Sequence, residues 1–546
     1  MTQVVIPMSG LGERFSQAGY SAPKPLVTVD GAAMISHVVN MFAADDRFIF
    51  VVNHDHMVNT NLSDVLRKAA PRCEIIGINT HRKGPVYAVS QCFDRIDVEE
   101  EIIVNYCDFY SHWNYSDFLA TTRERQSAGA IAAYRNFHPH MLGTDNYAFI
   151  REENHWLQAI QEKKPFTDNR MAEFASNGTY YFARGEYVRH YFAELIKRDI
   201  QVNGEYYVSM VYNLMVEDRL PVSIYEVEHM LQWGTPRDLE EYQHWSDYFT
   251  RLATDAKMLL PTGKVRENQI KAEASVDVCL IPMAGRGQRF ADAGYTTAKP
   301  LITVSGKPMV QLACDNLPPA RRYVFVAQGD HVTAELSSTL TASFNNVNVV
   351  ALEGISGGQA VSCQIGLEQA VPPVFAGESL LVGACDNGIV YDQNKWQNLL
   401  ADQTIDVAAF SFRQHPASER NPHMFGWLTT AAGNDEFPLI TGVSVKKAIS
   451  DNPRQDHAIV GAFYFRKTTY FLDALRVLLE DDIRVNGEFY VDSMIGILAQ
   501  GDLKCVAFEV DDYISFGIPN DLKTFEYWQT FFDKCSWHQY KNVVPS

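Results

Sequence analysis

The sequence predicts an α/β protein made of two tandem domains, each with a mixed, mainly parallel sheet covered by helices on both faces. Two observations predict this fold class. First, the opening segment returns about 275 positions later, as VVIPMSGLGERFSQAGYSAPKPLVTVDGAAMI from Val4 and VCLIPMAGRGQRFADAGYTTAKPLITVSGKPMV from Val278. Second, short apolar runs alternate with segments of helical periodicity, which is typical of a parallel sheet buried on both faces. A repeat of this period indicates a duplicated domain rather than a solenoid.

The first copy shows this alternation element by element. Gln3–Met8 is apolar and rich in β-branched residues, and glycines follow it, so it predicts a buried strand that enters a tight loop. Met34–Phe42 carries apolar residues at helical spacing and predicts a helix. The further predicted elements are strands at Phe48–Val52, Glu74–Ile78 and Ile102–Cys107 and helices at Asp64–Ala70 and Val86–Cys92.

The repeat continues to the end of the chain. Cys107-Asp108 returns as Cys385-Asp386, IQVNGEYYVSM as IRVNGEFYVDSM, and WGTPRDLEEYQHW as FGIPNDLKTFEYW. We therefore expect one domain over residues 1–249 and a second over 276–546. Residues 250–275 are predicted to connect them, with Pro261 and Gly263 as helix breakers.

Composition limits the class of protein. Of the 546 residues, 46% are hydrophobic and 21% charged, as in ordinary globular proteins. The net charge of −19 argues against nucleic acid or an anionic membrane as the main partner. There is no apolar run long enough to span a membrane, and the chain enters a strand without a signal-like segment. The nine cysteines include no CxxC pair, which favours reduced thiols and a cytoplasmic protein.

The repeated loop has the chemistry of a phosphate site. GxGxRF is not a dinucleotide motif, because Phe15 stands where that motif needs a third glycine, and it is not a Walker A loop, because Lys24 lies between two prolines. What remains is a glycine loop with an arginine two residues on and a Lys-Pro ten residues later. Backbone N–H groups and two fixed cations suit a triphosphate.

These motifs resemble those of the sugar-phosphate nucleotidyltransferases, of the glucose-1-phosphate thymidylyl- and uridylyltransferase type. Both copies are most similar to a subgroup associated with bacterial surface polysaccharides, which shares IPMAGxGxRF, PKPL, CD, NGEFY and GTPxDL. The resemblance implies two Rossmann-like, GT-A-like domains in which the loop binds NTP phosphates, the lysine bridges the α-phosphate and the aspartate holds Mg²⁺. The residues implied are Gly10, Gly12, Arg14, Lys24 and Asp108 in the first copy and Gly285, Gly287, Arg289, Lys299 and Asp386 in the second.

The reaction so implied is attack of a phosphate oxygen of a small acceptor on the α-phosphorus of an NTP. Both reactants are anions, so positioning and charge neutralisation carry the catalysis and no enzyme nucleophile is needed. The expected partners are an NTP and a phosphorylated small molecule.

The acceptor side differs between the copies. Glu162-Lys163 matches the family's Glu-Lys pair, which binds sugar hydroxyls and sugar phosphate, whereas the second copy has Val445-Lys446 and lacks the carboxylate. The glutamates of the NGEYY and NGEFY turns serve either as sugar contacts or as scaffold. The other residues expected on this side are Gly178, Glu205, Gly461 and Glu488.

Two further positions are less similar to the family. The loops at Gly84 and at Gly358-Gln359 correspond and are expected to contact the nucleotide, although their residues do not identify the base. The family's second metal aspartate falls near Gln232 in one copy and Ser515 in the other, which puts a second metal ligand in doubt.

The copies have diverged within the phosphate loop as well. The first places Glu13 there, which would repel a triphosphate unless it turns outward, while the second has Gln288 and an extra cation at Arg286. Three interpretations stay open: two active domains with different acceptors, one active domain with a degenerate partner in an intramolecular pseudo-dimer, or one regulated unit. A homo-oligomer is also compatible with the sequence.

Two other classes of protein are weighed against a nucleotidyltransferase. A sensor or scaffold made of inactive domains conflicts with the retention of the lysine and aspartate in both copies. A GT-A glycosyltransferase usually carries a DxD motif, and neither copy has one after its central strand.

Overall fold

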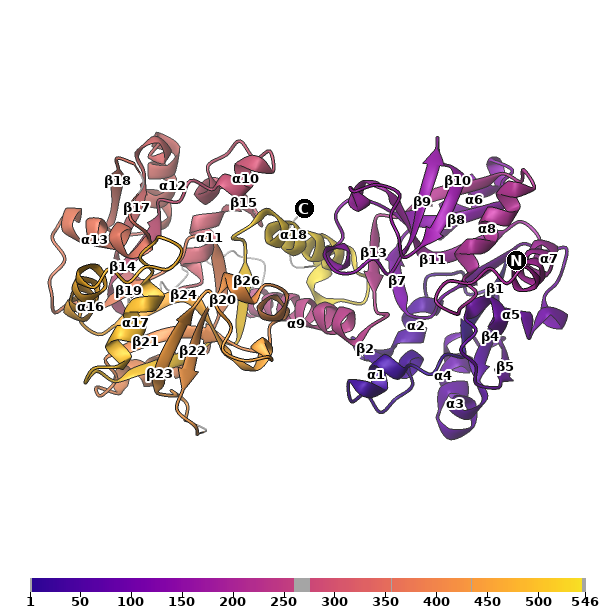
Figure 1. Cartoon of the computed structure of the whole chain (residues 1–546), viewed down its shortest axis with the longest axis horizontal. Helices are drawn as coiled ribbons and strands as arrows, with labels where there is room; N and C mark the ends of the chain where they lie inside the picture. The colour runs from indigo at the N-terminus through magenta and orange to yellow at the C-terminus, as the bar shows by residue number, and fades with distance from the viewer. Residues whose placement is uncertain (1, 260–274, 355, 434, 543–546) are drawn as a thin grey trace. The chain divides into compact units, whose positions relative to one another are not determined.

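The chain folds into two compact units, Met1–Pro261 with Tyr527–Ser546, and Thr262–Glu526. The computed structural model describes residues 2–259, 275–354, 356–433 and 435–542. Within each unit, helices cover both faces of a central mixed sheet (Figure 1). The α/β class predicted from the sequence is therefore confirmed.

The first unit is built on a nine-stranded sheet in the order β5-β4-β1-β6-β11-β8-β12-β10-β9. Strands β5, β4, β1 and β6 are parallel, and β11 is antiparallel to both β6 and β8. A two-stranded ribbon of β7 and β13 lies outside this sheet. The strand bounds are β1 Gln3–Met8, β4 Arg47–Asn53, β5 Glu74–Ile78, β6 Ile102–Asn105, β7 Phe109–His112, β8 Gly129–Tyr134, β9 Ala148–Glu153, β10 Trp156–Glu162, β11 Phe174–Phe182, β12 Val222–Glu226 and β13 His229–Gln232.

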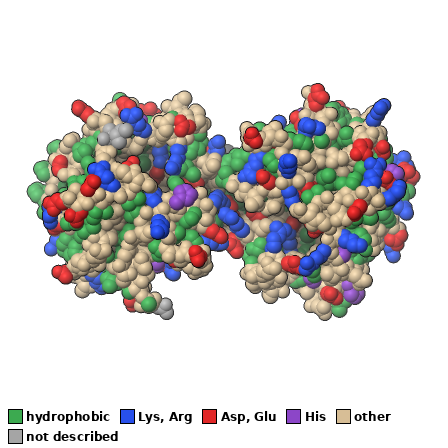
Figure 2. Space-filling model, viewed as in Figure 1, with side chains coloured by type: hydrophobic (Ala, Val, Ile, Leu, Met, Phe, Trp, Pro, Cys, Tyr) green, Lys and Arg blue, Asp and Glu red, His purple; other side chains and the backbone are tan. Residues whose placement is uncertain are grey.

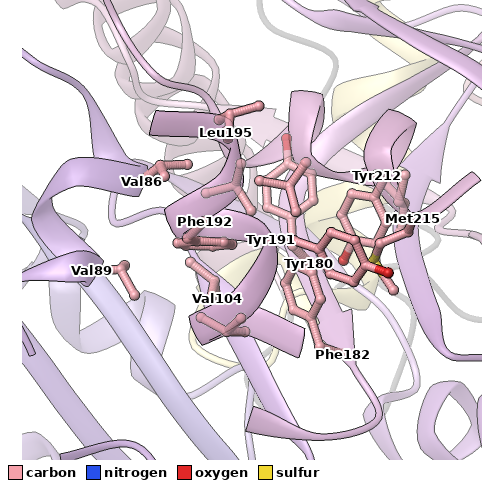
Figure 3. Close-up of a cluster of buried hydrophobic side chains, with 14 of the residues drawn as sticks. Val86, Val89, Val104, Tyr180, Phe182, Tyr191, Phe192, Leu195, Tyr212 and Met215 are labelled. Carbon is pink, nitrogen blue, oxygen red and sulfur yellow. The ribbon is translucent and has the colours of Figure 1, made fainter. Parts of the chain in front are cut away.

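Helices cover the sheet because each presents an apolar stripe to it. Figure 3 shows one such layer, where Phe192 and Leu195 of α7 and Tyr212 of α8 pack with Phe182 of β11. The Phe182 and Tyr212 rings stack with centroids 5.0 Å apart. The helical bounds are α1 Glu13–Gln17, η1 Lys24–Leu26, α2 Met34–Val39, α4 Leu62–Ala69, α5 Pro85–Ser90, α6 Tyr115–Glu124, α7 Gly185–Lys197, α8 Val208–Glu217 and α9 Pro236–Leu259.

The second unit repeats this topology with the order β18-β17-β14-β19-β24-β21-β25, and β22 joins β24 and β23. A ribbon of β20 and β26 corresponds to that of β7 and β13. The strand bounds are β14 Val276–Met283, β17 Ala320–Gln328, β18 Val347–Leu352, β19 Leu380–Val382, β20 Asn387–Val390, β21 Val407–Phe412, β22 Gly426–Thr430, β23 Ile440–Val445, β24 His457–Phe465, β25 Cys505–Glu509 and β26 Asp512–Ser515. The helices near its site are α10 Gln288–Asp292, η5 Lys299–Leu301, α13 Gln359–Gln369, α16 Thr468–Glu480 and α17 Val491–Ala499.

The predicted elements of the first copy form with small shifts at their ends. The strand expected over Ile102–Cys107 ends at Asn105, so Cys107 and Asp108 lie in the bend that follows it. The helix expected over Met34–Phe42 ends at Val39. Asp108 thus stands beyond the carboxyl end of β6, where a sheet of this kind binds ligands.

The packing units and the sequence copies divide the chain differently. Residues 527–542 are packed on the first unit, although the sequence assigns them to the second copy. Trp537 donates a hydrogen bond from Nε1 to Asp30 Oδ2 at 3.0 Å, and its ring lies 4.7 Å from that of Tyr110. Helix α9 runs to Leu259, into the predicted connector, and residues 260–274 of that connector lie outside the described residues. The domain boundaries 1–249 and 276–546 stay a prediction.

The surface carries charges of both signs. Figure 2 shows Asp and Glu side chains interspersed with Lys and Arg over the visible face of each unit, rather than gathered by sign. Among the described residues, no helix is both long enough and apolar enough to cross a membrane.

Candidate functional site

A cavity of about 560 Å³ opens at the carboxyl ends of β1 and β6 in the first unit. It gathers residues that lie far apart in the sequence, because the ends of neighbouring parallel strands meet at one edge of the sheet. Seven of the predicted site residues line it, namely Gly10, Gly12, Arg14, Lys24, Gly84, Asp108 and Glu205.

At the floor of this cavity Lys24 forms an ion pair with Asp108. Lys24 Nζ donates to Asp108 Oδ2 and, at 3.1 Å, to the carbonyl oxygen of Gly234. The two side chains are 15% and 25% exposed, so the pair is half-sheltered but open to a ligand. Removing one partner would leave the other charge poorly solvated, which makes the pair energetically interdependent.

Local structure fixes both members of this pair. Lys24 opens the short helix η1, and its ammonium lies 5.6 Å from the centre of the Phe15 ring, which is buried under the glycine loop. Asp108 is held from behind because its carbonyl oxygen accepts a hydrogen bond of 3.0 Å from the backbone N–H of Trp233. The cation and carboxylate are therefore positioned before any substrate binds, as electrostatic catalysis requires.

The second unit contains the same arrangement. Lys299 Nζ donates to Asp386 Oδ2, with exposures of 17% and 28%, and lies 5.7 Å from the centre of the Phe290 ring. The backbone N–H of Phe516 donates to the Asp386 carbonyl at 2.9 Å. Burial lowers the pKa of Lys299, but the neighbouring Asp386 outweighs burial and the net pKa is raised, so Lys299 stays charged. Gly285 and Gly287 lie in the loop before α10, and Arg289 lies in its first turn.

The glycine loop of the first unit carries an ion pair that the sequence did not predict. The Glu13 carboxylate turns toward Arg82, whose guanidinium donates to Glu13 Oε1. Beside it, Ser9 Oγ and His81 Nε2 are 3.1 Å apart. The repulsion expected between Glu13 and a triphosphate is thus reduced by a cation from the loop that carries Gly84.

Gly84 and Gly358 occupy the same structural position. Each precedes a helix, α5 or α13, with a positive φ of 83° or 135°. A Cβ at Gly84 would lie 2.8 Å from both the nitrogen and the oxygen of Tyr206, and a Cβ at Gly358 would lie 2.5 Å from the Phe489 nitrogen. These glycines therefore hold the nucleotide-side loop against the NGE turn, and Gln359 begins the helix in the second unit.

The residues predicted to bind an acceptor in the first unit form a polar chain next to the cavity. Lys163 Nζ donates to Tyr207 Oη at 2.8 Å, and Tyr207 Oη donates to Glu205 Oε2. Glu162 lies deeper, where it accepts a hydrogen bond from Ser209 Oγ on α8. Burial raises the pKa of Glu162. Tyr207 and Glu205 line the cavity directly, so Lys163 reaches it through Tyr207.

The corresponding residues of the second unit keep part of this chain. Lys446 has a left-handed backbone with φ 60°, matching the φ of 59° at Lys163. Its ammonium lies 5.6 Å from the centre of the Tyr490 ring, and Tyr490 is hydrogen-bonded to Glu488. The Lys-Tyr-Glu grouping is therefore present in both units.

The predicted residue Gly178 does not line the cavity of the first unit. Gly178 is buried in β11, where a Cβ would lie 3.0 Å from the ring of Phe109 and 3.1 Å from that of Tyr106. Gly178 and its counterpart Gly461 in β24 both have a positive φ, of 103° and 90°. Both mark an irregularity of the strand beside the bend that carries the aspartate.

The site chemistry excludes a thiol nucleophile next to the aspartates. Burial raises the pKa of Cys107 to about 12 and that of Cys385 to about 12, so both remain protonated at neutral pH. Asp108 and Asp386 each offer a carboxylate for a divalent cation, with the Gln232 amide near the first and the Ser515 hydroxyl near the second. This set fits Mg²⁺, which commonly binds one or two carboxylates and completes its shell with substrate phosphates and water.

Comparison with known proteins agrees with this geometry. Residues 4–170 match the model of the MobA-like NTP transferase domain, so the first unit contains an NTP transferase domain. The bifunctional protein GlmU of Bacillus cereus strain AH187 is 26% identical over 233 residues, which covers 41% of this chain and 47% of GlmU. The chain thus spans about half the length of the curated relatives it matches.

Two of the solved structures that match this chain each cover less than half of it. The nucleoside-diphosphate-sugar pyrophosphorylase of Vibrio cholerae RC9 is 22% identical, with 43% of this chain and 97% of that chain covered and a TM-score of 0.36. The UTP-bound UGPase of Acinetobacter baumannii is 17% identical, with 48% and 100% covered and a TM-score of 0.37.

Proposed function

We propose that the chain is a nucleotidyltransferase that joins an NTP to a phosphorylated sugar or small polyol and releases pyrophosphate. The observation that carries this proposal is the Lys-Asp ion pair under a GxGxRF loop, which occurs with the same geometry in both units. The matched NTP transferase domain supports it for the first unit. Synthesis of precursors for a bacterial surface polysaccharide in the cytoplasm is the role we propose for this reaction.

The proposed mechanism uses charge and position. An acceptor phosphate oxygen forms a bond to the α-phosphorus, and the bond between the α-phosphorus and the β-bridging oxygen breaks, so pyrophosphate carries away the electron pair. Arg14 and the loop N–H groups bind the triphosphate, and Lys24 neutralises charge on the α-phosphate. Bound Mg²⁺, held by Asp108, would add further neutralisation of the phosphate oxygens. Arg289, Lys299 and Asp386 have these roles in the second unit.

Two alternatives make different predictions. If one unit is a degenerate nucleotide-binding copy, only one of the two lysines matters for turnover. A GT-A glycosyltransferase would consume a sugar nucleotide and release a nucleoside diphosphate instead of pyrophosphate.

The test is a pyrophosphate-release assay on the full chain, with four NTPs, a panel of sugar and polyol phosphates, and Mg²⁺. Lys24→Ala and Lys299→Ala should each lower kcat about 10²–10³-fold for the activity of its own unit, since each removes one preorganised charge contact. Lys68→Ala, an exposed lysine on α4, is the matched control and should leave turnover unchanged. Turnover unaffected by either site lysine would refute the proposed roles.

A further inference from the structure

The sequence of the second unit lacks a carboxylate at Val445, the position of Glu162, but the structure places the carboxylate of Asp492 at the same hairpin end. Aligning the NGE turns pairs Ser209 with Asp492, and the hairpin registers pair Ala148 with Gly426 and Glu162 with Val445. In the first unit Glu162 lies opposite Ala148 in the β9–β10 ladder, and in the second unit Val445 lies opposite Gly426 in the β22–β23 ladder. Three neighbouring positions have therefore changed together.

In the first unit the carboxylate comes from the strand. Glu162 ends β10 and reaches Ser209 in the first turn of α8, where Ser209 Oγ donates to Glu162 Oε1. The carboxylate therefore fills the gap between the end of the hairpin and the start of the helix. Lys163 follows it in the chain and points to Tyr207.

In the second unit a carboxylate enters the same gap from the helix. Asp492 lies in the first turn of α17 and reaches back to the hairpin, so that a Cβ built on Gly426 would be only 2.3 Å from its Oδ1. An alanine there, as in the first unit, would occupy the space of this carboxylate. The Ala-to-Gly change and the Ser-to-Asp change thus depend on each other sterically.

Lys446 lies in the same part of the second unit, where its ammonium donates a hydrogen bond to the carbonyl oxygen of Met424. Lys446 follows Val445, and its backbone N–H donates to the carbonyl of Phe425, the residue before Gly426, at 3.0 Å. Asp492 and Lys446 interact electrostatically. Burial raises the pKa of the Asp492 carboxyl and lowers the pKa of the Lys446 ammonium. Both residues are half-buried, whereas a first-turn acid that serves only the helix could remain in solvent.

We propose that Asp492 replaces Glu162 as the hydroxyl-binding carboxylate of the second unit, and that this unit binds a phosphorylated, hydroxylated acceptor different from that of the first. The inference rests on the proposed function, in which Lys446 binds the acceptor phosphate. Asp492 accepts hydrogen bonds from an acceptor hydroxyl. Because it approaches from the helix and has a shorter side chain than Glu162, it selects a different hydroxyl position.

The test measures binding to the full chain in a Lys163→Ala background, which removes the acceptor lysine of the first unit. Glucose 1-phosphate, glycerol 3-phosphate and inorganic phosphate are titrated by calorimetry, and the second-unit site is defined as the binding that Lys446→Ala abolishes. Asp492→Asn should weaken that binding about 10-fold or more for a hydroxylated probe. Inorganic phosphate, which has no sugar or polyol hydroxyl, should bind equally or more tightly, since a negative charge has been removed near an anion.

Two variants separate this role from a structural one. Gly426→Ala keeps the charge but displaces the carboxylate, so it should weaken the hydroxylated probe as Asp492→Asn does. Asp473→Asn, an exposed acid on α16, is the matched control and should have no effect. Equal losses for all three probes, no change for any probe, or the absence of Lys446-dependent binding would each overturn the inference.

The outcome is distinguishable from that of the proposed function. Pyrophosphate release that is insensitive to Asp492→Asn in both KM and kcat would retain the transferase and reject the role of Asp492. Binding that depends on Asp492 without any pyrophosphate release would retain the acceptor site and reject the transferase reaction.

Discussion

The close approach of Gly84 to the NGE turn gives a stability prediction that can be worked out from the structure. Gly84 has φ 83° and ψ 179°, a region that is essentially restricted to glycine and costs about 1–3 kcal/mol for other residues. In Gly84→Ala the new Cβ would also lie 2.8 Å from the Tyr206 nitrogen and oxygen. Backbone atoms cannot rotate away as a side-chain tip can, so the turn itself must withdraw.

Withdrawal of the turn strains two hydrogen bonds. The Tyr206 N–H donates to the Lys83 carbonyl at 2.9 Å, and the Val86 N–H donates to the Tyr206 carbonyl at 3.1 Å. Each is worth about 1 kcal/mol net. Together with the backbone strain, we expect Gly84→Ala to lower the free energy of unfolding of the first unit by about 3–5 kcal/mol.

Gly204 supplies a matched control within the same turn. Its φ of 81° is nearly the same, but a Cβ there would meet nothing within 4 Å. Gly204→Ala should therefore cost only the left-handed strain, about 1–2 kcal/mol. The second unit repeats the experiment with Gly358→Ala, where the Cβ would lie 2.5 Å from the Phe489 nitrogen, against Gly487→Ala, which again has open space.

The assay is urea unfolding combined with hydrogen exchange. Exchange read on peptides that cover residues 83–90 and 202–210 assigns the loss to the first unit, because two units need not unfold in one transition. Equal destabilisation by Gly84→Ala and Gly204→Ala would refute the reasoning, since the clash with the Tyr206 backbone is the main difference between the two positions.

Two further predictions concern the first unit. Burial lowers the pKa of three histidines, to about 3 for His140, to about 4 for His229 and well below 6.5 for His138, whereas in the unfolded chain each binds a proton near 6.5. Below pH 6.5 the unfolded state therefore binds more protons than the folded state. The folding stability that is present above pH 6.5 should be lost as the pH falls toward 4. His140→Gln removes one of these groups and should reduce the dependence of Tm on pH. Trp537→Ala removes the indole hydrogen bond to Asp30 and a half-buried ring, and should lower the free energy of unfolding by about 2 kcal/mol. The loss should be measured as faster proteolysis at the C-terminus. Unchanged proteolysis would contradict a stabilising contact.

The parts of the candidate site that occur in both copies could be predicted from the sequence. The glycine loop, Lys24 and Asp108 recur with their order preserved, and strand-helix alternation places them at one edge of a sheet. The parallel strands β1, β4 and β5 have near-identical predicted and observed bounds for the same reason, since apolar runs bounded by turn residues are local signals.

Contacts between segments that are distant in the sequence could not be predicted from these local patterns. Arg82 pairs with Glu13 although 69 residues separate them, and nothing in either local pattern selects this partner. Gly84 is expected to contact the nucleotide, and the sequence did not predict that the fold also brings the backbone of Tyr206 against it. The packing of residues 527–542 on the first unit was missed because the repeat assigns them to the second copy.

Asp492 shows how comparison of the two units extends what one sequence reveals. In the alignment Val445 alone suggests a lost acceptor site, because the carboxylate is absent from its strand. The structure shows that the Asp492 carboxylate occupies the space that a Cβ at position 426 would need, so the glycine at 426 and the acid at 492 fit together. A copy released from function would be expected to discard its costly buried charges first, since apolar replacements at such positions are often neutral or stabilising. The second unit instead keeps the Lys299–Asp386 ion pair and places the Asp492 carboxylate against Gly426 at the end of the hairpin, which favours two working sites with different acceptors over one enzyme with a degenerate partner.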